Sequence, residues 1–282
     1  PICTGNATAL VGNTLTVDPA DTAIICTETN TRKTATLTLR KTWAVNSIAG
    51  NTTTVTNSGF INSGSSGLST ATALGNTTTG TAFTVFAGES GTISETFGVG
   101  TAANYDAVLS CTGNATAVVG NTLTVNPADT AIPCTETNTR KTATLTLRKT
   151  WAANSIAGNT VTVTTSGFIN NASSGLSTAT TIGNTTTGSA VTVYAGESGT
   201  LSESFGIGSA ANYSAALSCT GNTNALVGNA LTVNAADSAI VCTYTNTKIA
   251  GNTIQGKVFF DNGKGTATPH NGIQETGELG IG

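Results

Sequence analysis

The chain has 282 residues with a formal net charge of −3, and only 9% of its residues are charged. Its 11 Lys and Arg residues are too few and too scattered for a phosphate-binding stripe, which excludes nucleic acid as a partner. Abundant Thr, Asn, Gly, Ala and Ser, together with 38% hydrophobic residues, favour pleated sheet over helix and over disorder.

The chain contains no methionine and opens at Pro1-Ile2-Cys3 without a secretory signal. We therefore expect a processed product or a window from a longer polypeptide. No apolar run approaches the length of a membrane span, so no span is expected in this segment. Six cysteines in a charge-poor, Thr-rich chain indicate an oxidising, extracellular setting.

The sequence repeats with a constant 108-residue spacing, from Cys3 to Cys111 to Cys219. A period of this length corresponds to a whole domain. Residues 1–33 match the last third of a repeat, 34–141 and 142–247 are complete copies, and 248–282 differ in sequence. Since no Gly/Ser or Pro linker separates the copies, we expect a semi-rigid rod.

Each complete copy has the pattern of an Ig-like β-sandwich. Period-two alternation, interrupted by Gly, Asn and Pro clusters, predicts strands in the first copy at 35–45, 51–58, 69–74, 82–87, 92–99, 105–112, 122–125 and 131–139. The predicted class is therefore all-β, with tandem sandwiches in an elongated array.

The first strand of each copy carries a lysine on its apolar face. That face runs through Leu37, Leu39, Lys41 and Trp43 and continues to Val45, because alternate side chains of a strand share one side. The second copy has Lys149 in the matching place.

The same period-two rule places further polar residues inward. Glu95 lies between Ile93 and Phe97, and the last strand presents Glu136 and Asn138 with its cysteine. In the second copy the matching inward residues are Glu203, Tyr244 and Asn246. Glu89 and Glu197 follow Gly in turns, so we expect them to be exposed.

Buried charge is costly, and desolvation drives lysine toward the neutral amine and glutamate toward the protonated acid. A neutral amine can attack an Asn side-chain carbonyl while the acid polarises it and ammonia leaves. The candidates for such an isopeptide bond are Lys41, Glu95 and Asn138, then Lys149, Glu203 and Asn246. The alternative is a buried Lys–Glu pair with the Asn satisfying a turn.

The cysteines of each repeat fall on inward faces and predict one disulfide per repeat. The pairs are Cys3–Cys26, Cys111–Cys134 and Cys219–Cys242. A metal site is the competing interpretation, but two Cys without a nearby His fall short of a zinc set.

The layout of each copy resembles CnaB-type domains, also called SpaA-like or prealbumin-like, of bacterial surface adhesins and pilins. Leu-x-Leu-x-Lys near the start, Ser-Glu followed by Asn-Tyr, and Thr-Asn-Thr at the end carry this resemblance. It implies a Lys–Asn bond with a catalytic Glu at the candidate residues, whereas the disulfide is not a usual feature of the family.

The tail reads Ile-Gln-Gly-Lys-Val-Phe-Phe-Asp-Asn-Gly from Ile254 to Gly263 and Asn-Gly-Ile-Gln-Glu-Thr-Gly-Glu from Asn271 to Glu278. This pattern resembles the start of a B-type repeat of serine-aspartate surface proteins. This resemblance implies a calcium loop, with oxygen ligands from Asp261, Asn271, Glu275 and Glu278. A solvated turn is the alternative, and we expect no other cofactor.

Two function classes follow from the sequence, and neither is a turnover enzyme. The first is an extracellular stalk or filament subunit at a bacterial cell surface. Its partners are copies of itself, joined head to tail by strand complementation of 1–33, or flanking domains of a longer chain. The second is a binding module for a host, glycan or ice surface.

Overall fold

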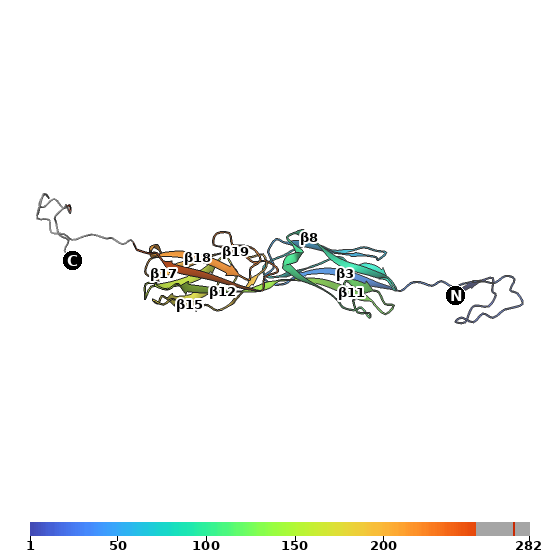
Figure 1. Ribbon diagram of the computed structural model, residues 1–282. Coiled ribbons are helices and arrows are strands. Elements are labelled where there is room, and N and C mark those ends of the chain that lie inside the picture. Colours follow the sequence, from blue (N-terminus) through green and yellow to red (C-terminus); the bar gives the residue numbers. More distant parts are fainter. Residues whose placement is uncertain (252–272, 274–282) are drawn as a thin grey trace, which may run out of the picture.

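The computed structural model describes residues 1–251 and residue 273. β-strands make up nearly all regular structure there, and two sandwiches lie end to end in an elongated molecule (Figure 1). The predicted all-β class with sandwich domains is therefore confirmed. In the described part of the chain, no helix is long and apolar enough to cross a membrane.

The first sandwich packs a five-stranded sheet against a four-stranded sheet. The five-stranded sheet has the order β6-β3-β11-β9, with β7 also on β3, and the four-stranded sheet has the order β10-β8-β4-β5. The strands are β3 (Thr34–Trp43), β4 (Thr52–Ser58), β5 (Ser65–Thr70), β6 (Asn76–Thr79), β7 (Phe83–Phe86), β8 (Ser90–Val99), β9 (Tyr105–Cys111), β10 (Thr122–Thr124) and β11 (Ala131–Arg140), with a 3-10 turn η1 (Ala102–Asn104).

The second sandwich repeats this arrangement. Its sheets have the orders β15-β12-β20-β18, with β16 also on β12, and β14-β13-β17-β19. The strands are β12 (Thr142–Trp151), β13 (Thr160–Ser166), β14 (Ser173–Thr178), β15 (Asn184–Thr187), β16 (Val191–Tyr194), β17 (Ser198–Ile207), β18 (Tyr213–Thr220), β19 (Ala230–Thr232) and β20 (Ala239–Lys248), with a 3-10 turn η2 (Ala210–Asn212).

Strand β3 is an interior strand of the five-stranded sheet of the first sandwich. Its threonines alternate with buried Leu37, Leu39 and Trp43, so one face joins the core and the other meets solvent or neighbouring loops. On one edge it pairs in parallel with β11, and on the other edge it pairs with β6 and β7. The chain therefore enters along β3 and leaves along β11 in the same direction.

Two details of the expected strands are wrong. Val45 is 64% exposed, because β3 ends at Trp43 and the chain turns through Asn46, whose φ is 64°. The expected strand 69–74 also ends too late: β5 stops at Thr70, Leu74 is exposed in a turn, and a further short strand β6 follows.

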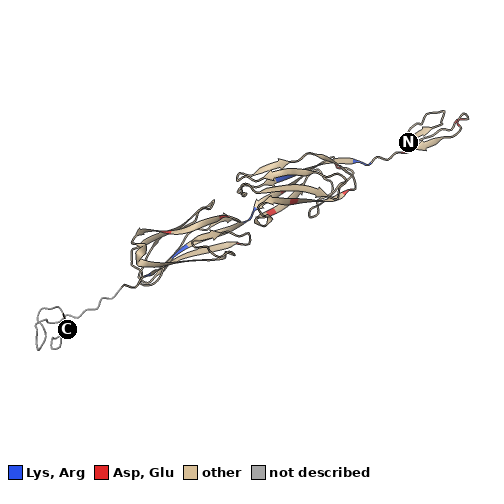
Figure 2. Ribbon diagram, turned by 90° about the horizontal axis from the view of Figure 1, so that it is seen from above, with Lys and Arg blue, Asp and Glu red and all other residues tan. Residues whose placement is uncertain are grey.

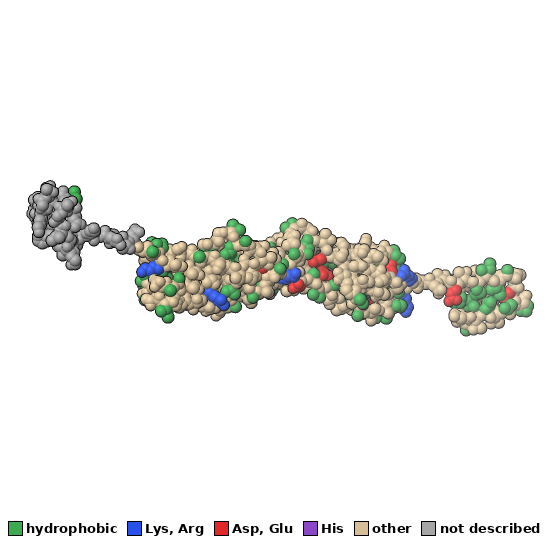
Figure 3. Space-filling model, in the orientation of Figure 1, with side chains coloured by type: hydrophobic (Ala, Val, Ile, Leu, Met, Phe, Trp, Pro, Cys, Tyr) green, Lys and Arg blue, Asp and Glu red, His purple; other side chains and the backbone are tan. Residues whose placement is uncertain are grey.

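Residues 1–33 form only a small two-stranded unit. β1 (Ile2–Thr4) pairs antiparallel with β2 (Ile25–Thr27), and an extended segment leads to the first sandwich (Figure 1). Apolar side chains gather on its visible surface in Figure 3. Val11, Val17 and Ile25 of this unit are exposed. This unit thus leaves uncovered the kind of apolar surface that the complete copies bury.

Candidate functional site

The strongest candidate site is a cluster of polar side chains between the two sheets of the first sandwich. Lys41 projects from β3 with a side-chain exposure of 0%, and its Nζ lies 2.8 Å from Oε2 of Glu95 on β8 in the opposite sheet. The same Nζ lies 5.0 Å from the centre of the Trp43 ring. The lysine is therefore enclosed and does not reach solvent.

The last strand of the sandwich contributes the amide. Asn138 is fully buried on β11, and its Nδ2 donates a 3.1 Å hydrogen bond to Glu95 Oε2, the oxygen that Lys41 also contacts. One carboxylate oxygen thus holds both the amine and the amide. The structure brings Lys41, Glu95 and Asn138 together, as the period-two rule predicts.

A second carboxyl lies beside this trio. Glu136 is buried on β11, two residues before Asn138, and it pairs in register with Lys41 of β3. The sequence pattern placed Glu136 on the inward face, but no role was predicted for it. The period-two alternation of β11 could have indicated that Glu136 lies beside Asn138 in the core.

Burial perturbs the ionisation of the cluster. Desolvation lowers the pKa of Lys41 below that of an ordinary lysine, although the hydrogen bond and charge of Glu95 and the charge of Glu136 oppose this shift. Desolvation and the charge of Glu95 raise the pKa of Glu136, although Lys41 opposes this. Both shifts move these groups toward the uncharged forms that amide exchange needs.

The second sandwich holds a simpler cluster. Lys149 Nζ lies 3.0 Å from Glu203 Oε2 and 4.7 Å from the centre of the Trp151 ring, and burial lowers the lysine pKa. Asn246 is fully buried in register with Trp151, and within the described residues neither atom of its amide has a hydrogen-bond partner. The ion pair is therefore formed, while the amide is close in register but unpaired.

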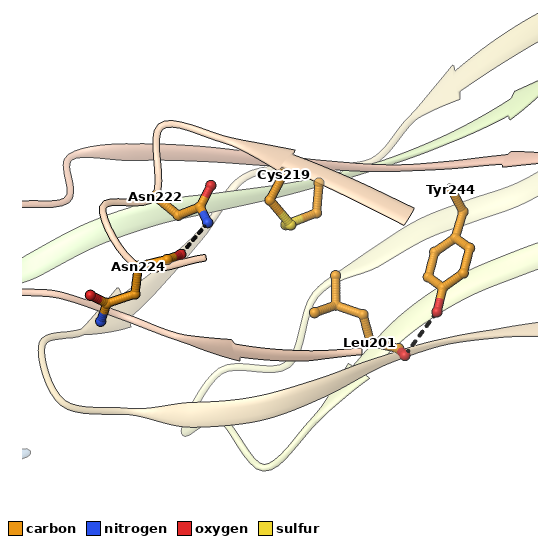
Figure 4. The surroundings of a disulfide bond; sticks show 6 residues. Leu201, Cys219, Asn222, Asn224 and Tyr244 are labelled. Atoms are coloured by element: carbon orange, nitrogen blue, oxygen red, sulfur yellow. Dashed lines mark hydrogen bonds between the residues drawn. A yellow bond between two sulfur atoms is a disulfide. The ribbon is translucent and has the colours of Figure 1, made fainter. Parts of the chain in front are cut away.

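Tyr244 stands in the second sandwich where Glu136 stands in the first. Both are in register with the buried lysine of their own sandwich. The Tyr244 hydroxyl donates a 3.1 Å hydrogen bond to the backbone oxygen of Leu201, as Figure 4 shows. This hydroxyl is thus engaged by the backbone and not by the Lys–Glu pair.

Three disulfides join the cysteine pairs expected within each repeat, Cys3–Cys26, Cys111–Cys134 and Cys219–Cys242. In the sandwiches each one links directly opposed residues of the last strand and its antiparallel neighbour. Figure 4 shows the disulfide of Cys219, whose partner Cys242 belongs to the core of the second sandwich.

The expectation that Glu89 and Glu197 are exposed is wrong. Each is only 7% exposed and accepts two backbone hydrogen bonds. Glu89 receives the amides of Phe86 and Ile61, and Glu197 receives those of Tyr194 and Ile169. A carboxylate with two such donors is stable when buried, so these residues tie two loops together.

A second candidate feature is the junction between the sandwiches. Arg140, at the end of β11, is buried and donates 2.7 Å and 3.1 Å hydrogen bonds to the backbone oxygens of Ala195 and Asn46. Its guanidinium lies 5.7 Å from the centre of the Tyr194 ring, and the Tyr194 hydroxyl accepts a hydrogen bond from Asn46. Sequence reasoning missed this contact, because it depends on residues brought together from both repeats.

The other surfaces offer little chemistry. Charged residues are sparse along the ribbon (Figure 2). A shallow groove lies between residues 63–67 and 79–83 of the first sandwich, and a matching one lies between 173–175 and 187–191 of the second. No ionisable side chain is among the residues that line either groove.

The calcium candidates Asp261, Asn271, Glu275 and Glu278 lie outside the described residues. Within residues 1–251, no group of three or more His, Cys, Asp or Glu side chains could hold a metal ion.

No protein-family model and no curated protein sequence matches the chain. Solved structures that are similar to the chain include pilins and an adhesin. The major pilin T-13 of Streptococcus pyogenes has 15% identity and a TM-score of 0.38, covering 78% of this chain and 100% of the pilin. The shaft pilin SpaA of Lactobacillus rhamnosus GG has 13% identity and a TM-score of 0.24, covering 78% of this chain and 100% of that one.

A Mobiluncus mulieris adhesin is also similar, with 11% identity and a TM-score of 0.28, covering 73% of this chain and 88% of the adhesin. That adhesin contains intramolecular disulfide, isopeptide and ester cross-links. At these identities and TM-scores the likeness does not identify the function of this chain, which has to be argued from its own geometry.

Proposed function

We propose that this chain is a structural, load-bearing segment of an extracellular stalk or fibre at a bacterial cell surface. Its units are the complete repeats 34–141 and 142–247, each held by a disulfide and closed by a Lys–Asn isopeptide bond. The observation that carries this proposal is the parallel pairing of the first and last strands around a buried Lys–Glu–Asn cluster.

Parallel pairing determines how each sandwich responds to tension. The register of β3 and β11 runs from Thr36 opposite Ala131 to Trp43 opposite Asn138. Force applied through the two chain ends pulls these neighbouring strands past one another, so the hydrogen bonds of the ladder are loaded together. A fibre subunit benefits from this geometry, whereas a globular binding module gains nothing from it.

The buried cluster supports a covalent lock on the same two strands. Glu95 takes a proton from the Lys41 ammonium, the amine Nζ bonds to Cγ of Asn138, and the Cγ–Nδ2 bond breaks. Of the three ammonium protons, one stays on the new amide and two leave with Nδ2 as ammonium, so Glu95 ends as it began. No cofactor or oxidant is needed.

This lock would shorten the path that carries load. Tension would pass from the start of β3 to Lys41, across the new bond to Asn138, and out through Arg140. Residues 42–137, including the disulfide Cys111–Cys134, would then carry no load. The second sandwich would behave in the same way through Lys149 and Asn246.

Partners along the fibre are copies of this chain or flanking domains of a longer chain. The exposed apolar side chains of 1–33 support the inference that this unit is completed by a strand from a neighbour. The disulfides support an oxidising, extracellular location.

Single-molecule pulling of the full chain tests this function. With both bonds formed, neither sandwich extends under force, because the bond bypasses it. The Asn138→Ala variant releases the first sandwich alone, adding roughly 3.5 Å for each residue of that sandwich outside the loop closed by Cys111–Cys134, and the second sandwich serves as the internal control. Wild-type traces in which both sandwiches extend fully would contradict the proposal.

The grooves favour a second candidate, a binding module for a glycan or another surface ligand. Both sandwiches carry the groove at the same place, and its lining of small hydroxyl side chains suits a polar ligand. Binding of the full chain to a glycan array, lost on replacing Ser65 and Ser173 with Phe, would support this candidate.

A further inference from the structure

The Lys–Glu–Asn clusters of the two sandwiches differ in one neighbouring residue, which is an acid in the first sandwich and a tyrosine in the second. Glu136 and Tyr244 occupy matching places beside the buried lysines, and Glu28 occupies that place in 1–33. Glu28 is exposed, whereas Glu136 is buried between the sheets. The first sandwich therefore holds two carboxyls around one lysine, and the second holds one.

Two side-chain oxygens of the first cluster accept no hydrogen bond from the part of the chain that the structure describes. Within the described residues, Glu136 Oε2 and Asn138 Oδ1 are both buried and without a hydrogen-bond partner. Lys41 Nζ is likewise without one, although it forms the 2.8 Å ion pair with Glu95 Oε2. The two oxygens belong to residues i and i+2 of one strand, so both side chains lie on the same face. Two unpaired acceptors are costly in a core, and a proton on Glu136 would turn one of them into a donor.

The surrounding charges favour that proton. The charged groups that act on Glu136 are Lys41 from β3 and Glu95 from β8. Since Lys41 already pairs with Glu95, a second ionised carboxyl would add an uncompensated negative charge to the core. Burial and the charge of Glu95 accordingly raise the Glu136 pKa.

We propose that Glu136 is a second, proton-bearing acid of the first cluster, which donates a hydrogen bond to Asn138 Oδ1 as the Lys41–Asn138 bond forms. This inference rests on the proposed isopeptide function. The two acids then divide the work: Glu95 moves protons from Nζ to the departing Nδ2, and Glu136 keeps its proton and stabilises the negative charge that develops on Oδ1. The second sandwich lacks this acid, because Tyr244 donates to Leu201 instead.

The consequence is a different pH dependence in the two sandwiches. Higher pH favours the neutral lysine in both. In the first sandwich alone, it also removes the Glu136 proton and places a negative charge beside Oδ1. The rate of bond formation in the first sandwich, divided by that in the second, should therefore fall as pH rises.

Refolding kinetics of the full chain measure this ratio. The chain is isolated from inclusion bodies as unfolded material whose mass equals that of the unmodified sequence, so that neither bond has yet formed. It is then diluted from denaturant into native buffer at a series of pH values and digested at successive times. Mass spectrometry then quantifies the two cross-linked peptides separately. We expect the ratio to fall with pH, and a ratio that is constant with pH would overturn the role of Glu136.

Matched variants distinguish the effect of the Glu136 proton on the rate of bond formation from an effect of side-chain packing. Glu136→Gln keeps an N–H donor for Oδ1, so it should retain fast bond formation and lose the pH dependence of the ratio. Glu136→Tyr should slow the first sandwich on the order of 100-fold, as loss of an oxyanion donor does. The reciprocal Tyr244→Glu should accelerate the second sandwich and give it the same pH dependence. A Glu136→Gln ratio that still falls with pH would contradict the proposal.

Failure of the bond itself is distinguishable from failure of Glu136. If neither sandwich loses ammonia, the isopeptide function is wrong. Carbon-13 NMR of the glutamate carboxyls in the same chain then tests the acid directly, with Glu28 as the exposed reference. A Glu136 carboxyl that is protonated at neutral pH supports the proton-bearing role, and a carboxyl that is ionised there overturns it.

Discussion

A lysine side chain enclosed in a sandwich core adds little to the free energy of unfolding. Replacing a buried ion pair with apolar residues of similar volume is often neutral or stabilising, because desolvation consumes most of the Coulomb attraction. Lys41 and Lys149 both have 0% side-chain exposure and one carboxylate partner. Each is placed by its strand against a carboxylate from the opposite sheet, and in the first sandwich the same carboxylate oxygen also holds the Asn138 amide. Chemistry explains this arrangement better than packing does.

Ionisation of Glu136 should make the first sandwich less stable as pH rises. A glutamate whose pKa is raised on folding is protonated in both states below its unfolded pKa, so no cost arises there. As pH rises from that value through the folded pKa, the buried charge lowers the free energy of unfolding. Glu136→Gln should remove this loss and raise the melting temperature of the first sandwich at neutral pH.

Calorimetry of Glu136→Gln and wild type at acidic and neutral pH checks this. Glu28→Gln is the control, since Glu28 is exposed and should leave both transitions unchanged. Equal stability of wild type and Glu136→Gln at neutral pH would contradict a protonated Glu136.

At the scale of elements, three interactions hold the last strand of the first sandwich, β11, in place. β11 pairs with β3 on one edge and with β9 on the other, and Cys134 binds it covalently to Cys111. The disulfide links β11 to its antiparallel neighbour, while the proposed isopeptide bond links it to its parallel one. The two bonds thus secure different edges, and neither makes the other redundant.

Replacing Cys111 and Cys134 together with Ala should destabilise the first sandwich by about 3 kcal/mol, the loop-entropy contribution expected for such a short closed loop. Denaturant unfolding followed by the tryptophans measures it, with the matching change at Cys219 and Cys242 acting on the second sandwich. A loss of stability confined to the sandwich that keeps its cysteines, or no loss at all, would contradict the stabilising role of each disulfide in its own sandwich.

Alternation within strands was the most informative property of the sequence. It predicted the inward placement of Lys41, Glu95 and Asn138, because period two is fixed by strand geometry alone. It failed where a turn or a tertiary hydrogen bond determines whether a side chain is buried or exposed. Val45 follows the end of its strand, and Glu89 is buried because two backbone amides from different loops satisfy it.

At the scale of the whole molecule, the junction sets the stiffness of the rod in Figure 1. Only Lys141 separates β11 from β12, and its backbone is bonded to Asn104 on one side and Ala195 on the other. Arg140 adds hydrogen bonds to both sandwiches. Arg32 makes the equivalent bond to Ala87 and lies against Phe86, so the first sandwich receives its preceding segment in the same manner.

Arg140→Ala should loosen this junction without unfolding either sandwich. The variant loses the charge-assisted hydrogen bond to Ala195 across the interface, worth roughly 1.5–3 kcal/mol, and the bond to Asn46 that holds the guanidinium on its own sandwich. Small-angle scattering should show a wider spread of inter-sandwich angles. Arg148→Ala, at an exposed position, is the control. Scattering curves that are identical for the two variants would contradict this role of Arg140.

The intact mass of the reduced full chain tests the central claim most directly. A structural segment locked by Lys41–Asn138 and Lys149–Asn246 should be lighter than its sequence by one ammonia for each complete sandwich, and Asn138→Ala should abolish the loss in the first sandwich alone. A mass equal to that of the unmodified sequence would contradict the covalent lock and leave only buried ion pairs.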